Sequence, residues 1–159
     1  MLAVHGSTQN FQVDSLNKLV QDKFEGVSFP MWGLTGEYYW QLNHYVKVGG
    51  GINILDDGSV EATYAIDDNE VESDQIAAFP KRLKVSIFPS FELVLYKFGI
   101  FLHPGFYIIK NKLANDVPAF YQRLGVRYHV IDHLFCGVNI RAYEFKSANF
   151  IEYSAGFKF

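Results

Sequence analysis

The chain of 159 residues has little charge, one cysteine and no long apolar run. The single cysteine, Cys136, excludes an internal disulfide. Charged residues make up 19% of the chain and the net charge is −3 without a basic stripe, so no nucleic-acid partner is expected. No apolar run approaches the ~20 residues of a membrane-spanning helix, which excludes a helical membrane span within these residues. The length fits one domain.

Residues 1–5 have neither the basic start nor the apolar run of a secretory signal. We therefore expect that a signal peptide is absent from this sequence because it has been removed. The alternative, that the protein is not exported, would contradict the membrane interpretation that follows.

Aromatic residues are abundant, at 17% of the chain, with 15 Phe and 10 Tyr. From Ile151 to Phe159, every second residue is apolar or aromatic. Side chains of a strand alternate between its two faces, so this segment has one oily face. An alternating strand that ends on an aromatic residue is typical of the last strand of an outer-membrane β-barrel.

Six earlier segments alternate in the same way, each close to the ~10 residues of a tilted membrane strand. They are residues 32–42, 45–54, 84–95, 98–108, 120–130 and 133–143. The pattern predicts an all-β fold, a small antiparallel up-and-down transmembrane β-barrel. Such barrels usually have an even number of strands, so we expect eight.

Two segments compete to be the eighth strand. Residues 59–66 alternate well and follow the hairpin signal Asp57-Gly58, so we favour them. Residues 11–20 alternate poorly and fit a short amphipathic helix instead. The sequence therefore divides into an N-terminal extension, residues 1–28, helical or irregular, and a barrel, residues 29–159.

The connections differ in length and polarity. Tyr96-Lys97 and Ile131-Asp132 are tight and suit periplasmic turns, whereas residues 67–81 and 110–117 suit extracellular loops. The acidic residues within 67–81 are expected to be solvated, with divalent-cation binding near lipopolysaccharide as the alternative.

Two prolines, Pro89 and Pro104, fall in the middle of predicted strands. Proline removes a hydrogen bond from the ladder, and a closed barrel has no free edge, so bulges are expected at both positions.

The alternation also predicts which side chains face inward and which face lipid. A barrel of eight strands is filled by its own side chains, and buried charges must be paired, so a polar core is expected and a pore is not. The inward set includes Glu37, Lys47, Lys84, Glu92, His103, Arg123, Arg127, Arg141 and Glu152. The outward set includes Trp32, Trp40, Phe98, Phe106, Phe120, Cys136, Tyr153 and Phe157.

One possible catalytic cluster follows from these faces. Ser90 and Glu92 share a face near His103 on the next strand, so a Ser–His–Glu set is geometrically possible. Any barrel with a polar core would supply such a set by chance, which makes the signal weak. No metal-binding or cofactor-binding motif is found.

The C-terminal third resembles a known family. The segments that carry the resemblance are Tyr121-Gln-Arg-Leu-Gly-Val-Arg-Tyr128, Asp132-His-Leu-Phe135 and Ala148-Asn-Phe-Ile-Glu-Tyr-Ser-Ala-Gly-Phe-Lys-Phe159. They are similar to the end of Bacteroidetes proteins classed as acyloxyacyl hydrolases, which belong with the lipid A 3-O-deacylase (PagL) family of outer-membrane barrels. The resemblance implies a bacterial outer-membrane location, contact with outer-membrane lipid and lipopolysaccharide, and hydrolysis of an acyl ester.

The residues at the family's site positions are only partly retained. Relatives carry Lys-Ala-His and then Ala-Asp-Phe-Ile-Glu-Trp, whereas this chain has Tyr143 for the histidine and Asn149 for the aspartate. The acid is matched by Glu152, which we expect to pair with Arg141. We also expect no His-x-Ser pair of the kind that better-known lipid A deacylases carry. Tyrosine, with a pKa near ~10, is a poor base at neutral pH.

Two functions remain. The first is a catalytically silent barrel that is structural, or an accessory subunit in a complex with other outer-membrane proteins. The alternative is a lipid A acyl-ester hydrolase. The missing histidine favours the silent barrel.

Overall fold

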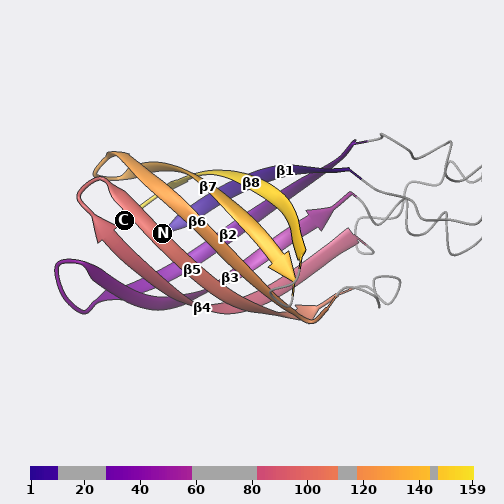
Figure 1. The fold of residues 1–159 in the computed structure, drawn as a ribbon, viewed down its shortest axis with the longest axis horizontal. Helices are drawn as coiled ribbons and strands as arrows, with labels where there is room; N and C mark the ends of the chain where they lie inside the picture. The colour runs from indigo at the N-terminus through magenta and orange to yellow at the C-terminus, as the bar shows by residue number, and fades with distance from the viewer. Residues whose placement is uncertain (11–27, 59–81, 111–117, 144–146) are drawn as a thin grey trace, which may run out of the picture.

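A computed structural model of the chain describes residues 1–10, 28–58, 82–110, 118–143 and 147–159. Eight antiparallel strands form a closed barrel in which each strand pairs with the next and β1 pairs with β8 (Figure 1). The predicted fold class is therefore confirmed. The strands are β1 (Leu2–Asn10), β2 (Ser28–Gln41), β3 (Val46–Asp57), β4 (Leu83–Leu95), β5 (Phe98–Ile109), β6 (Phe120–Ile131), β7 (Leu134–Tyr143) and β8 (Ser147–Phe157).

The eighth strand is β1, at the start of the chain. It pairs along its whole length with β2, and Leu2–Gly6 also pair with β8. The prediction that residues 59–66 supply this strand is wrong, because β1 closes the barrel by pairing with both β2 and β8. The barrel thus begins inside the expected extension of residues 1–28. Residues 11–20 and 59–66 themselves lie outside the described residues.

The two ends of the barrel differ. Three short connections, residues 42–45, 96–97 and 132–133, lie at one end together with both chain termini (Figure 1). We call this the turn end. Tyr96 in the β4–β5 connection has a φ of 58°, the left-handed conformation that tight hairpin turns use. Because β1 is the extra strand, the connection after β2 lies at the turn end, beside Tyr96-Lys97.

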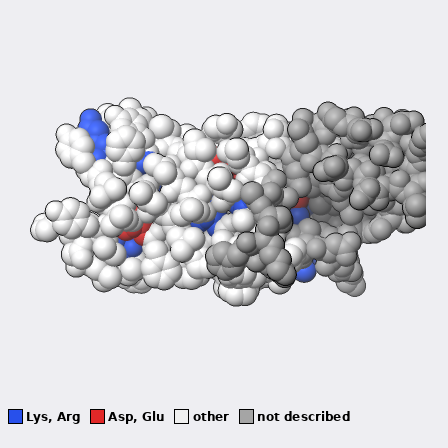
Figure 2. Space-filling model, in the orientation of Figure 1, with Lys and Arg blue, Asp and Glu red and all other residues white. Residues whose placement is uncertain are grey.

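The wall of the barrel is apolar outside and polar inside. Trp32 and Tyr153 are 62% and 65% exposed, whereas Arg141 and Glu152 are fully buried. The predicted faces are confirmed: the other outward aromatics and Cys136 are exposed or partly exposed, and the predicted inward charges are buried. Figure 2 shows one side of the barrel, on which uncharged residues cover most of the described outer wall. Apolar side chains outside and polar side chains inside, the reverse of the arrangement in a soluble protein, are typical of barrels that face lipid.

The two mid-strand prolines do not form bulges, so this prediction is wrong. The β4–β5 register is the same on both sides of them, with Ile87 opposite Phe106 and Phe91 opposite Leu102. This register sets Pro89 opposite Pro104. Each proline lacks a backbone N–H, so β4 and β5 are not paired between Ile87–Phe106 and Phe91–Leu102. Neither strand has an extra residue in this interval. The irregularity in this ladder falls at Val85 and Ser86 instead.

No helix in the described ranges is long and apolar enough to cross a membrane.

Candidate functional site

The interior of the barrel holds a network of arginine and glutamate side chains. Arg127 binds Glu37 through both carboxylate oxygens, with Nη2 at 2.6 and 2.7 Å. Arg123 lies between two acids, 3.6 Å from Glu37 and 3.5 Å from Glu152. Arg141 Nη2 lies 2.7 Å from Glu152 Oε1, which confirms the expected pair. The inward charges therefore neutralise one another, as a buried polar core requires.

Aromatic rings fill the space around this network. His103 packs between Phe88 and Phe101, with ring centroids 4.5 Å away on each side. The Arg127 guanidinium lies 4.2 Å from the centroid of Phe101. A central cavity lined by His5, Arg123 and their neighbours measures only about 10 Å³. This central part of the barrel is filled and leaves no room for a substrate.

The structure does not bring the three family-matched positions together. Glu152 accepts a hydrogen bond from Asn139 at 2.5 Å and is paired with it across β7 and β8. Tyr143 lies four residues further along β7, opposite Ser147, and its hydroxyl lies 3.5 Å from that of Tyr107. Asn149 belongs to β8, but its side chain lies outside the described part of the chain.

The alternative cluster of Ser90 and His103 is assembled only indirectly. Ser90 Oγ donates to the Tyr39 hydroxyl at 2.6 Å, and His103 Nε2 lies 3.3 Å from the same hydroxyl. His103 Nδ1 accepts from Arg123 at 3.0 Å. Glu92 is bound elsewhere, to Arg127 and Lys47. Tyr39 thus separates the serine from the histidine, and both lie fully buried.

Sequence reasoning missed His5, the histidine that lies beside Glu152. Closure of β1 onto β8 places His5 Nδ1 3.8 Å from Glu152 Oε2, while Nε2 bonds Asn53 Oδ1 at 2.7 Å. Gly33 makes room for the ring, because a Cβ there would lie 2.0 Å from His5 Cε1. The available signal was His5-Gly6-Ser7, a His-x-Ser pair. The expectation that the chain has no His-x-Ser pair is therefore wrong, because the pair lies in β1 and not in the C-terminal segments that resemble the family.

Ser7 lies where the seam between β1 and β8 ends. Backbone pairing stops at Gly6 and Tyr153, and Ser7 Oγ then donates to the Ile151 carbonyl at 2.5 Å. A groove of about 500 Å³ opens here on the outer wall, lined by Ser7 and Gly6 with Trp32, Ile151 and Tyr153 among its walls. Ser7 therefore borders the outer groove, but no described hydrogen bond joins it to His5 or Glu152.

A metal site is not evident in the described ranges, where no three or more His, Cys, Asp or Glu side chains gather closely enough to hold an ion. The acidic residues of 67–81, for which cation binding was the alternative, lie outside those ranges.

Comparison with family models shows which family the chain matches. A family model described as acyloxyacyl hydrolase, C-terminal domain, matches residues 1–159. None of the curated proteins matches the chain.

Proposed function

The chain belongs to the acyloxyacyl hydrolase C-terminal domain family, and from this premise we propose that it is a catalytically silent β-barrel of the bacterial outer membrane. The apolar outer wall and the family support the location, because only a closed barrel or a helix can satisfy its backbone in lipid. The filled interior supports a structural role for its charged residues.

One observation carries the proposal of silence, namely the surroundings of Glu152. An acid in a hydrolytic triad orients the imidazole through a hydrogen bond. Glu152 is fully buried, accepts from Asn139 and faces Arg141 and Arg123. His5 bonds Asn53 instead, and Ser7 bonds a backbone carbonyl. A serine without a base in hydrogen-bond reach is a weak nucleophile.

A silent barrel acts through contacts with its neighbours. We propose that the chain serves as a structural or accessory subunit of an outer-membrane assembly, in contact with lipid and lipopolysaccharide. Its wall exposes large side chains such as Trp32, Trp40 and Tyr153, which suit either lipid or the wall of another barrel. Affinity purification from native membranes, with mass spectrometry, tests this role. Recovery of the barrel without a stoichiometric outer-membrane partner would exclude the accessory role.

A second candidate function is hydrolysis of an acyl ester of lipid A. The observation that favours it is that His5 lies 3.8 Å from Glu152 and that Ser7, two residues further along β1, lines the outer groove. In this alternative, Ser7 Oγ attacks the ester carbonyl carbon from the outer groove and His5, turned away from Asn53, takes the hydroxyl proton. Glu152 then stabilises the imidazolium. The acyl C–O bond then breaks, the alcohol leaves with the proton from His5, and water hydrolyses the acyl-serine to release the fatty acid.

Mass spectrometry of lipid A from cells that express the chain separates the two candidates. We expect unchanged acylation, because general base catalysis typically contributes ~10²–10⁴-fold and no described serine bonds a histidine. Loss of one ester-linked chain that disappears in Ser7→Ala would establish the second candidate. Loss that survives Ser7→Ala but disappears in Ser90→Ala would assign the reaction to the Ser90–His103 cluster.

A further inference from the structure

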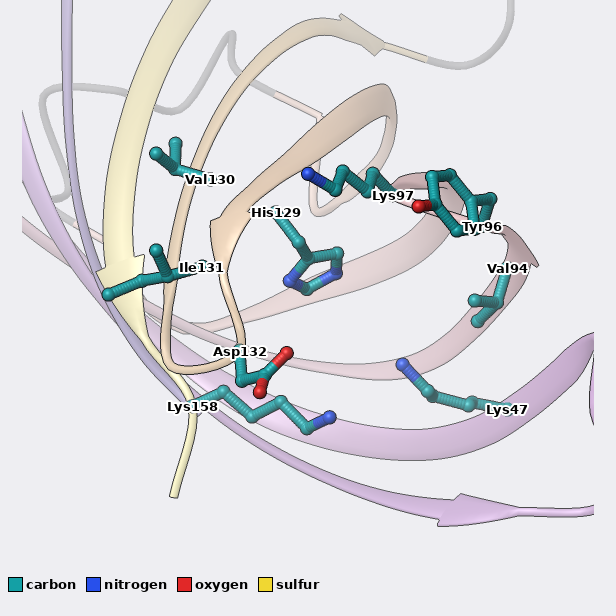
Figure 3. Close-up of a pocket in the computed structure, with 9 residues that line it drawn as sticks. All are labelled: Lys47, Val94, Tyr96, Lys97, His129, Val130, Ile131, Asp132 and Lys158. Carbon is teal, nitrogen blue, oxygen red and sulfur yellow. The ribbon is translucent and has the colours of Figure 1, made fainter.

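Lysine side chains surround a cavity at the turn end of the barrel (Figure 3). The cavity measures about 370 Å³ and is reached by Lys47 from β3, Lys97 from the β4–β5 connection and Lys158 from beyond β8. In Figure 3, Lys47 and Lys158 extend toward the space that the His129 ring and the Asp132 carboxylate also face. We call these five residues the lysine mouth.

The lysine mouth is positive, although the net charge of the chain is −3. Three ammonium groups line the cavity with one carboxylate, that of Asp132. Two positive charges therefore remain without a counterpart in the lining. An anion entering the mouth would find an attractive potential.

The acid beneath the mouth, Glu92, pairs with Lys47 and is shared with Arg127, so it compensates the charge of the mouth only in part. Glu92 Oε1 lies 3.6 Å from Lys47 Nζ and 3.9 Å from His129 Nε2, but its other oxygen lies 3.3 Å from Arg127. Within the ranges that the structure describes, Lys97 and Lys158 form no ion pair. Their ammonium groups are thus available to a ligand.

Size, charge and position together indicate the chemistry of that ligand. A cavity of about 370 Å³ suits a small polar group, not a peptide segment. A phosphate offers three strong acceptor oxygens, one for each lysine, whereas a carboxylate has two. Tyr96, 92% exposed at the rim, is a residue type that favours the membrane–water interface. We infer that the lysine mouth binds a phosphate group, presented by a lipid headgroup or by a small soluble phosphate ester.

Calorimetric titration of the refolded full-length chain in uncharged detergent tests this inference. The two probes are glycerol 3-phosphate, for the soluble source, and dihexanoyl phosphatidylglycerol, for the lipid source. We expect at least one probe to bind, with an affinity that falls as salt is added. Binding of the lipid alone assigns the site to headgroups, and binding of both shows that the phosphate ester suffices.

Matched variants locate the binding. The double variant Lys97→Gln and Lys158→Gln should weaken it at least about tenfold, since a hydrogen bond to a charged group contributes about that factor. Lys110→Gln, at the opposite end, is the control and should bind like the parent. Heat-modifiable gel migration shows that each variant is folded. Failure of both probes to bind, an equal loss in the control, or tighter binding of an oligoglutamate peptide than of either probe would overturn the inference.

Discussion

At the scale of single residues, the alternation of a strand decides which way each side chain faces, and the sequence predicted this well. The partners were harder to predict. Arg141 and Glu152 sit on neighbouring strands, so their pairing was foreseeable, whereas Arg127 and Glu37 meet across the barrel from β6 and β2. A contact across the lumen depends on strand tilt and stagger, which alternation does not contain.

Replacing Glu152 by Gln should destabilise the barrel. The change leaves Arg141 buried without its counter-charge, and breaking a buried ion pair in this way costs about 3–5 kcal/mol. Urea unfolding in lipid vesicles measures the free energy of unfolding. The control is Asp56→Asn, because Asp56 and Arg82 form a pair whose side chains are each 23% exposed. Solvent screens such a partly exposed pair, so its loss should cost less than that of the fully buried pair. Equal losses in the two variants would contradict a structural role for Glu152.

At the scale of elements, seven strands were predictable and the eighth was not. Leu2 and Val4 alternate with Ala3 and His5, but residues 6–10 are all small or polar, so the strand signal fades after a few residues. The strand forms because both its edges find partners, and that information lies in distant segments. Because the pairing of β1 with β8 could not be predicted, the proximity of His5 to Glu152 could not be predicted either. The candidate site was therefore only half predictable, with the acid found and its neighbouring histidine missed.

Deleting residues 1–10 should abolish the closed barrel, since β2 and β8 would each lose a partner strand. Shortening residues 60–79 to a Gly-Ser linker is the matched control, because the eight strands that close the barrel lie in the described ranges on either side. Gel migration before and after heating reports closure. We expect heat-modifiable migration to survive in the control and to be absent in the deletion. The reverse outcome would restore residues 59–66 as a wall strand.

At the scale of the whole molecule, the barrel has an apolar outer wall and a polar interior, and the sequence predicted both. Abundant aromatic residues and few charged residues indicated an apolar outer surface, and the family match is consistent with that interpretation. Such a chain should require detergent or lipid to remain dispersed. The position of the barrel relative to the bilayer is then open to a direct test.

A lysine on the outer wall should report its depth in the membrane. Val126 and Val130 are similarly exposed on β6, at 44% and 45%, but Val126 lies mid-strand and Val130 near the turn end. Val126→Lys should lower the free energy of unfolding in vesicles by about 2–4 kcal/mol, and Val130→Lys by about 0–1 kcal/mol. Equal, small effects at both positions would argue against a bilayer around the wall.

The pairing of β1 with β8 also sets a delay between the synthesis of β1 and the closure of the barrel. Leu2 lies opposite Phe157, so the first strand to leave the ribosome must wait for the last. At about 5–20 residues per second, that wait is roughly 8–30 s. Until β8 arrives, β1 has one bare edge of backbone donors and acceptors, which is the kind of edge that recruits other chains. We therefore expect the chain to be prone to pairing with other chains until β1 and β8 meet.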